Sequence, residues 1–284
     1  MRGVPYVLRL FGAGLTRPKV RIPGMDMAGI VEQVGSGVER LKVGDEVFGE
    51  TLSASRRDNA GAFAEFVAVP EEVLLKKPEG LSFVDAAAVP TSGFVALQAV
   101  KAQAEVQAGQ RVLVNGAAGG VGAFAVQIAK AYGAEVTVVD SGEKLEMLRS
   151  IGADHVVDYR QQDYTRMGLR YDAIADVAAK RSLKECARAL TPNGIYVPTG
   201  DQGGRWIGAF GDMLRIYAMS LFVSQRLGGF VTLGKRGALQ ELKDLIEAGK
   251  LRPVIDRTYP LEEAAEAIWQ LEKGRVLGKI VLTV

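Results

Sequence analysis

From residue 111 onward, short apolar runs alternate with segments of helical period. The runs are rich in β-branched residues and predict strands that are buried on both faces, whereas apolar positions three and four apart predict helices that cover them. The predicted strands are 111–115, 134–139, 155–158, 171–176 and 194–200. Helices are predicted after the first strand, as far as Lys130, and at 143–151 and 181–190. This alternation predicts an α/β fold with a doubly wound parallel sheet.

The first eighty residues have a different pattern of apolar and turn-forming residues. Short strands bounded by turn residues are predicted at 24–35, 44–49 and 61–69, which together suggest an irregular, β-rich, barrel-like module. A turn-rich connector at 76–80 precedes a small helix that opens with a capping box at Ser82 and Asp85. The remaining predictions are helices at 92–101, 238–248 and 261–272 and a last strand at 278–284.

The turn that follows strand 111–115 carries Gly116, Gly119 and Gly122. Glycines at this spacing let the backbone turn sharply and let a pyrophosphate lie against the amides at the N-terminus of the next helix. Asp140 ends the second strand, at the distance where an acid would hold ribose hydroxyls. Strand, turn, helix, strand and acid in this order predict a dinucleotide-binding unit.

The glycine turn has two other possible interpretations. The glycines would also permit close packing of helix on strand, and for Gly122 that interpretation stands beside the functional one. A methyltransferase that binds S-adenosylmethionine also has a glycine-rich first turn, but the further βαβ units and the flanking sequence argue against this class.

Composition excludes several classes of protein. The chain has 284 residues, enough for two domains, and a formal net charge of +2 with no basic stripe, so nucleic-acid binding is not indicated. No apolar run approaches the length of a membrane span, and a single cysteine suits a reducing compartment. We therefore expect a cytoplasmic protein.

The pieces together resemble the zinc-independent quinone oxidoreductase branch of the medium-chain dehydrogenase/reductase superfamily. The resemblance covers essentially the whole chain. It rests on the glycine turn and on the segments 23–29, 43–47, 61–66, 87–93, 152–154 and 278–281.

This resemblance implies a Rossmann domain inserted in a GroES-like substrate domain. We predict the GroES-like domain at 1–85 plus 236–284 and the Rossmann domain at 86–235. The resemblance also implies hydride transfer from a nicotinamide to a quinone or an α,β-unsaturated carbonyl. It further implies that the protein is a homodimer. Residues 1–6 resemble the middle of the GroES-like domain, so the chain is expected to lack its first strands.

The candidate site residues come partly from the motif and partly from the resemblance. Asp140 favours NADH, because it would accept ribose hydroxyls and repel a 2′-phosphate. Lys144 and Tyr159, with Ser141 nearby, match positions where such quinone reductases contact the 2′-phosphate, so NADPH is preferred and NADH remains possible. The predicted cofactor-binding residues are Thr91, Gly116, Ala117, Gly119, Gly120, Val121, Gly122, Asp140, Ser141, Lys144, Tyr159 and Gly200.

Candidates for catalysis are few. Tyr6 is the nearest candidate for a substrate-side phenol, and the proton for reduction can come from water. A catalytic zinc needs three protein ligands, whereas the chain has one cysteine, Cys186, and one histidine, His155, so no metal is expected. Cys186 is predicted to pack in the core, His155 to lie at an exposed strand end, and Asp26 to support the structure.

The sequence thus predicts a metal-free, NAD(P)H-dependent reductase of quinones or enones. The alternative is a protein that binds the cofactor without catalysis.

Overall fold

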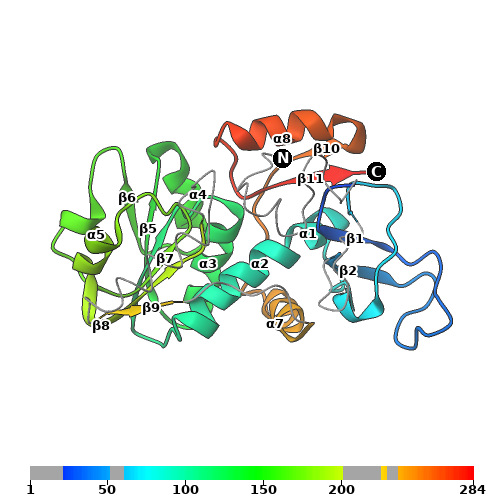
Figure 1. Cartoon of the computed structure of the whole chain (residues 1–284), viewed down its shortest axis with the longest axis horizontal. Coiled ribbons are helices and arrows are strands. Elements are labelled where there is room, and N and C mark those ends of the chain that lie inside the picture. The colour runs from blue at the N-terminus through cyan, green and yellow to red at the C-terminus, as the bar shows by residue number, and fades with distance from the viewer. Residues whose placement is uncertain (1–21, 52–60, 201–224, 229–235) are drawn as a thin grey trace, which may run out of the picture. The chain divides into compact units, whose positions relative to one another are not determined.

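The computed structural model describes residues 22–51, 61–200, 225–228 and 236–284. The chain divides into two compact units. One comprises the described residues from Val95 to Val231, and the other those from Val20 to Phe94 and from Thr232 to Val284. Each unit is described separately below (Figure 1).

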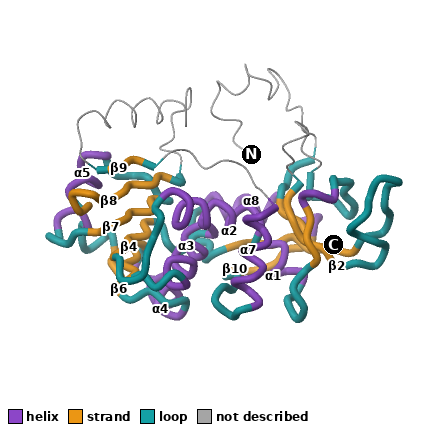
Figure 2. The backbone as a smooth tube through the Cα atoms, turned by 90° about the horizontal axis from the view of Figure 1, so that it is seen from below, coloured by secondary structure: helices purple, strands orange, loops and turns teal. Residues whose placement is uncertain are grey.

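The first unit is built on a six-stranded sheet in the order β6-β5-β4-β7-β8-β9, with every neighbouring pair parallel. Figure 2 shows its strands stacked in succession, from β6 past β4, β7 and β8 to β9. The strands are β4 (Arg111–Asn115), β5 (Glu135–Asp140), β6 (His155–Asp158), β7 (Tyr171–Asp176), β8 (Leu190–Pro198) and β9 (Arg226–Leu227).

Helices follow these strands and cover the sheet. α3 packs on β4 and β5, α4 packs on β6, and α5 packs on β8. Both faces of the central strands are therefore buried, and Leu113, Ile174 and Leu190 are fully enclosed. The helices are α3 (Gly120–Ala131), α4 (Leu145–Ser150) and α5 (Leu183–Arg188). This arrangement confirms the predicted doubly wound parallel sheet.

The second unit holds a three-stranded antiparallel sheet in the order β1-β2-β3 and a parallel pair formed by β10 and β11. α1 packs on β1 and β11, and α7 packs on β3. Its elements are β1 (Asp26–Ile30), β2 (Glu46–Glu50), β3 (Leu74–Lys76), α1 (Phe83–Ala88), α7 (Arg236–Glu247), β10 (Ile255–Pro260), α8 (Ala264–Glu272) and β11 (Lys279–Thr283).

One prediction about local structure was wrong, and the structure refines another. The segment 61–69 contains bends and no strand, because Gly61 has a φ of 74° and the alternating pattern does not bury a face, with Phe66 73 % exposed. The helix predicted at 92–101 is α2 (Pro90–Leu97) followed by a π-helix, Gln98–Gln103. Apolar periodicity does not distinguish these two helix types over so short a segment.

The N-terminus of α5 offers a test of how local sequence stabilises this fold. Ser182 accepts a hydrogen bond from the amide of Glu185, whose carboxylate in turn accepts one from the amide of Ser182. We expect Ser182→Ala to lower the free energy of unfolding by about 1 kcal/mol in urea titration, because the amide of Glu185 loses its acceptor. Ser182→Thr keeps the oxygen and serves as the control. An equal loss in both variants would show that the cap is not the cause.

Candidate functional site

The three glycines of the first βα turn have three different environments. Gly116 has a φ of 78°, and a Cβ there would lie 2.9 Å from the amide nitrogen of Ala178. A Cβ on Gly122 would collide with the carbonyl oxygen of Gly116 and with Ala117, so this glycine lets α3 approach the turn. Among the described residues, the carbonyl oxygen of Gly116, at 3.8 Å, is the only atom that a Cβ on Gly119 would meet. The protein itself therefore requires glycine at 116 and 122, whereas Gly119 leaves a space outside the turn.

The amides at the start of α3 lie beside this space. Ala123 donates the first helical hydrogen bond, to the carbonyl of Gly119, at 2.9 Å. The amides of Gly120, Val121 and Gly122 precede it and make no hydrogen bond to any residue that the structure describes. Unpaired amides and the positive end of the helix dipole together favour an anion.

Other amides of the turn are used by the protein. The amides of Gly116 and Ala117 donate to the carbonyl of Val139. The amide of Ala118 donates to Asp140 Oδ2 at 2.9 Å. Ala117 and Ala118 are also fully buried. A ligand at this turn would therefore contact residues 119–122 rather than Ala117.

Both carboxylate oxygens of Asp140 accept hydrogen bonds from backbone amides. Oδ2 accepts from Ala118, and Oδ1 accepts from the amide of Ser141 at 2.8 Å. Ser141 is buried, and its hydroxyl lies 3.5 Å from the same Oδ1. The acid at the end of the second strand thus holds the glycine turn against β5.

Charged residues gather where β5 and β6 end. Tyr159 is 51 % exposed and lies beside Arg160, whose guanidinium is 5.8 Å from the ring centroid. Arg160 forms a bidentate pair with Glu143, at 2.8 and 3.1 Å. Tyr159, followed by Glu143, raises the pKa of Arg160, and the backbone amide of Glu143, together with Arg160, lowers the pKa of the Glu143 carboxyl. Lys144 lies half-buried at the end of the turn Gly142–Lys144.

Arg160 was missed in the sequence analysis. The sequence did offer a signal, because an arginine near the acid at the end of the second strand accommodates a 2′-phosphate in NADP-binding Rossmann folds. Its location became evident only from the pairing of β5 with β6, in which Asp140 is opposite Asp158.

A buried carboxylate joins the ends of β4, β7 and β8. Asp176 is fully buried, and its Oδ1 accepts from the side-chain amide of Asn115 at 2.8 Å and from the amide of Ala179 at 2.7 Å. The hydroxyl of Tyr196 donates to Oδ2 at 2.8 Å. Burial raises the pKa of Asp176, and the three donors oppose that shift. Because every partner donates, this arrangement suits an ionised carboxylate.

The loops after these strands are tightly packed around Asp176. The amides of Thr199 and Gly200 donate to its backbone carbonyl, and a Cβ on Gly200 would collide with the carbonyl of Val177. Ala179 has a φ of 47°, which the hydrogen bond from its amide to Asp176 helps to hold. Gly200 therefore lies at the carboxyl edge of the sheet, in the same unit as the glycine turn.

Thr91 belongs to the other unit, where it lies in α2 near the ion pair of Asp26 and Lys279. Its amide donates to Asp26 Oδ1 at 2.9 Å, and its hydroxyl makes a short hydrogen bond to the same oxygen. The ammonium group of Lys279 lies 3.2 Å from Asp26 Oδ2 and 3.0 Å from the hydroxyl of Ser92. Asp26 therefore fixes the first turn of α2, in line with the supporting role predicted for it. Tyr6 lies outside the described residues.

The residues that could bind a metal do not fit a zinc site. Cys186 is buried beside the hydroxyl of Tyr164, and burial raises the pKa of its thiol to about 12. His155 is exposed at the start of β6, where Nε2 lies 2.7 Å from Glu135. Among the described residues, no three His, Cys, Asp or Glu side chains form a group that could hold a metal ion.

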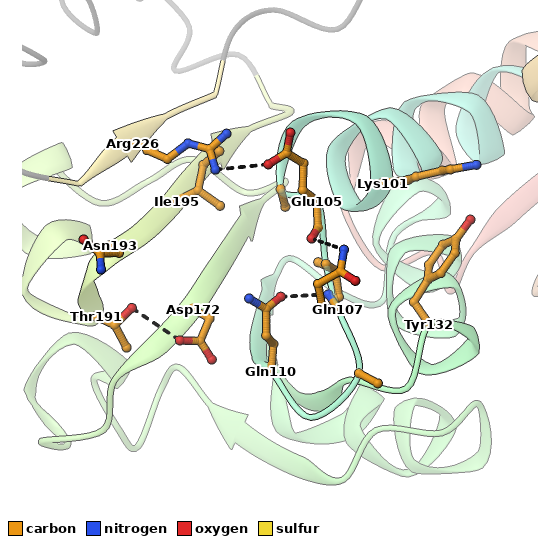
Figure 3. Close-up of a pocket in the computed structure, with 13 residues that line it drawn as sticks. Lys101, Glu105, Gln107, Gln110, Tyr132, Asp172, Thr191, Asn193, Ile195 and Arg226 are labelled. Atoms are coloured by element: carbon orange, nitrogen blue, oxygen red, sulfur yellow. Dashed lines mark hydrogen bonds and ion pairs between the residues drawn. The ribbon is translucent and has the colours of Figure 1, made fainter.

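A cavity of about 880 Å³ lies at the opposite, amino edge of the parallel sheet (Figure 3). Its side chains are largely paired with one another. Arg226 contacts Glu105 at 3.2 Å, and the hydroxyl of Thr191 lies 3.4 Å from Asp172. Because it lies away from the strand ends that carry the glycine turn, we do not assign the nucleotide to it.

None of the helices in the described ranges is long and apolar enough to cross a lipid bilayer.

Comparison with known proteins identifies related families for both parts of the chain. Residues 7–79 match the alcohol dehydrogenase GroES-like domain, and residues 151–282 match a family described as zinc-binding dehydrogenase. A quinone oxidoreductase from Pseudomonas aeruginosa is 33% identical, with 99% of this chain and 88% of that protein covered.

Two further relatives extend this finding. A 2-methylene-furan-3-one reductase from Solanum lycopersicum is 32% identical over 93% of this chain, which spans 64% of that protein's length. The structure of a quinone oxidoreductase from Coxiella burnetii superposes with a TM-score of 0.83 at 30% identity, covering 96% of this chain and 81% of that one.

The Asp176 network yields a prediction about stability. We expect Asp176→Ala to lower the free energy of unfolding in urea by about 3 kcal/mol, because three buried donors lose their acceptor. Tyr196→Phe removes one donor only and should cost about 1 kcal/mol. If Asp176→Ala cost no more than Tyr196→Phe, the carboxylate would not join the three strand ends.

Proposed function

Because the chain belongs to the quinone oxidoreductase-like branch of the medium-chain dehydrogenase/reductase superfamily, we propose that it is an NAD(P)H-dependent reductase. Its substrate would be a quinone or an α,β-unsaturated carbonyl compound. The observation that carries this proposal is the open space at Gly119 beside the unpaired amides of residues 120–122. The relatives described above, a 2-methylene-furan-3-one reductase and quinone oxidoreductases, favour this substrate class.

The pyrophosphate of the cofactor would bind at Gly119, Gly120, Val121 and Gly122. The bound nicotinamide would supply the hydride. Ala117 and Asp140 would shape the turn instead of contacting the ligand, because both are used in contacts within the protein. Gly200 would border the cofactor at the carboxyl edge of the same sheet.

Reduction of an activated C=C bond or a quinone needs a hydride and a proton but no Lewis acid. We propose metal-free chemistry, because the whole sequence has one cysteine and one histidine and the described residues contain no group of ligands that suits zinc. Thr91 and Tyr6 remain the proposed residues on the nicotinamide and substrate side.

NADPH is the proposed cofactor. Both carboxylate oxygens of Asp140 already accept backbone amides, which leaves this acid fewer acceptor sites for the ribose hydroxyls of NADH. Tyr159, Lys144 and Arg160 would face the 2′-phosphate at the ends of β5 and β6, whereas Ser141 would hold Asp140.

Three coarser features complete the proposal. We propose a homodimer and a cytoplasmic location. We also propose domain limits at residues 86 and 235, with the Rossmann domain between them.

The phosphate site can be tested at Gly119. We expect Gly119→Leu to abolish NADPH binding in calorimetry, because the side chain would fill the space that the pyrophosphate needs. Thermal unfolding should change little, since Gly119 has a φ of −78° and a Cβ there would come no closer than 3.8 Å to any atom of the described residues. Gly122→Ala is the contrasting variant and should unfold at a lower temperature. If a folded Gly119→Leu protein retained its affinity for NADPH, the nucleotide would bind elsewhere. If the wild type bound NADPH without reducing any quinone or enone, the non-catalytic alternative would be favoured.

Cofactor preference can be tested at Arg160. We expect Arg160→Ala to raise the KM for NADPH about tenfold, the effect of losing 1.4 kcal/mol of binding, while the KM for NADH changes little. Arg149→Ala, which removes an exposed arginine paired with Glu146 in α4, is the control. A parallel rise in both KM values would contradict a contact with the 2′-phosphate.

A further inference from the structure

Two carboxyl groups face one hydroxyl in the unit that contains β1, β2 and β11. Asp26 on β1 and Glu50 on β2 are opposite each other in the antiparallel pair, and the Thr91 hydroxyl contacts both. Glu50 is 8% exposed, so water contributes little to its solvation. The proposed reaction gives Glu50 no role, and the sequence analysis did not single it out.

The hydroxyl of Thr91 has a single proton to donate. The short hydrogen bond to Asp26 Oδ1 takes that proton, because Asp26 is the carboxylate paired with the ammonium group of Lys279. Thr91 Oγ1 nevertheless lies 3.3 Å from Glu50 Oε2. If Glu50 were ionised, two oxygen atoms would face each other there without a hydrogen between them.

A proton on Glu50 satisfies every group. The acid O–H would donate to Thr91, the hydroxyl of Thr91 would donate to Asp26, and Asp26 would keep its ion pair with Lys279. We propose that Glu50 is a neutral carboxylic acid in the folded protein and that its proton positions Thr91. Ionisation of Glu50 would loosen the start of α2, so that Thr91 is held less firmly as the pH rises.

The charges around Glu50 support this assignment. Burial, followed by the negative charge of Asp26, raises the pKa of Glu50 above its ordinary value of 4.5. A hydrogen bond donated by Thr91 to Glu50 would oppose that shift, but the proton of Thr91 is donated to Asp26. The described cations near β2 are committed to other carboxylates. Lys279 pairs with Asp26, and Lys76 and Lys77 on and after β3 pair with Asp45 and Glu46 at the far end of β2. On α1, Asp85 is bonded to Ser82.

The proton itself can be measured without any assumption about the activity. In Glu50→Gln the side-chain amide can donate to Thr91 but cannot ionise. We expect the infrared difference spectrum between wild type and Glu50→Gln at neutral pH to contain the C=O stretch of a protonated carboxylic acid. Glu46→Gln, on the same strand but half-exposed and paired with Lys77, is the matched control and should lose only a carboxylate band. A carboxylate band alone in the Glu50 difference spectrum would overturn the proposal.

Stability gives a second measurement. A carboxyl group whose pKa is raised by folding favours the native state less as the pH rises from its unfolded pKa through its folded pKa. The unfolding temperature of the wild type should therefore fall relative to that of Glu50→Gln as the pH rises above about 4.5, whereas below that pH the difference between them stays constant. The same pH dependence in both proteins would contradict a neutral Glu50.

The positioning role rests on the proposed function and has its own readout. We expect NADPH oxidation by the wild type to decline at alkaline pH and that decline to be absent in Glu50→Gln. Glu50→Ala, which cannot donate to Thr91, should lower kcat across the whole pH range. An unchanged alkaline decline in Glu50→Gln would refute the positioning role, whereas absence of NADPH oxidation in the wild type would count against the proposed function and leave the infrared result valid.

Discussion

The close approach of backbones at the carboxyl edge of the parallel sheet constrains everything near the proposed nucleotide site. α3 can start where it does only because Gly122 has no side chain to collide with the carbonyl of Gly116. On either side, a carboxylate fastens the turn and its neighbours: Asp140 binds the amide of Ala118, and Asp176 binds the ends of β4, β7 and β8. The space beside Gly119 thus has rigid walls, and a ligand there would not have to order them.

The sequence predicted this part of the fold well because its signals are local. The central strands β4, β5 and β7 are largely buried runs, and the glycine spacing reports a turn whose geometry depends on a few consecutive residues. Secondary-structure prediction failed where the local sequence pattern and the tertiary contacts disagree. Residues 61–69 alternate like a strand, yet Phe66 is left exposed and Gly61 turns the backbone.

The side chains that the sequence analysis missed depend on contacts between distant segments. Glu50 meets Thr91 across 41 positions, and Asn115 meets Asp176 across 61. No periodicity within one element reveals such a pair, because it requires the order of the strands and their register. Arg160 lies between these two cases. Its place after a strand could be predicted from the sequence, but its ion pair with Glu143 could not.

The two buried carboxyl groups show how hydrogen-bond partners decide a protonation state. Burial raises the pKa of both Asp176 and Glu50. Three donors converge on Asp176 and no acceptor does, so a proton there would face one of those donors. Glu50 instead faces a hydroxyl whose proton is already donated to Asp26, and a neighbouring negative charge. Similar desolvation therefore leads to opposite states, with an ion at the end of β7 and a neutral acid on β2.

The ion pair between Arg160 and Glu143 limits how strongly the proposed site could prefer NADPH. Arg160 is paired with Glu143 before any ligand binds, so a 2′-phosphate would exchange one anionic partner for another. The pair is exposed, and exposed ion pairs contribute only about 0–1 kcal/mol. The exchange is nevertheless favourable, because a phosphate carries more charge than the carboxylate and brings three acceptor oxygens. Glu143 would thus make the proposed preference modest and dependent on ionic strength, which suits a site in which Asp140 holds the turn.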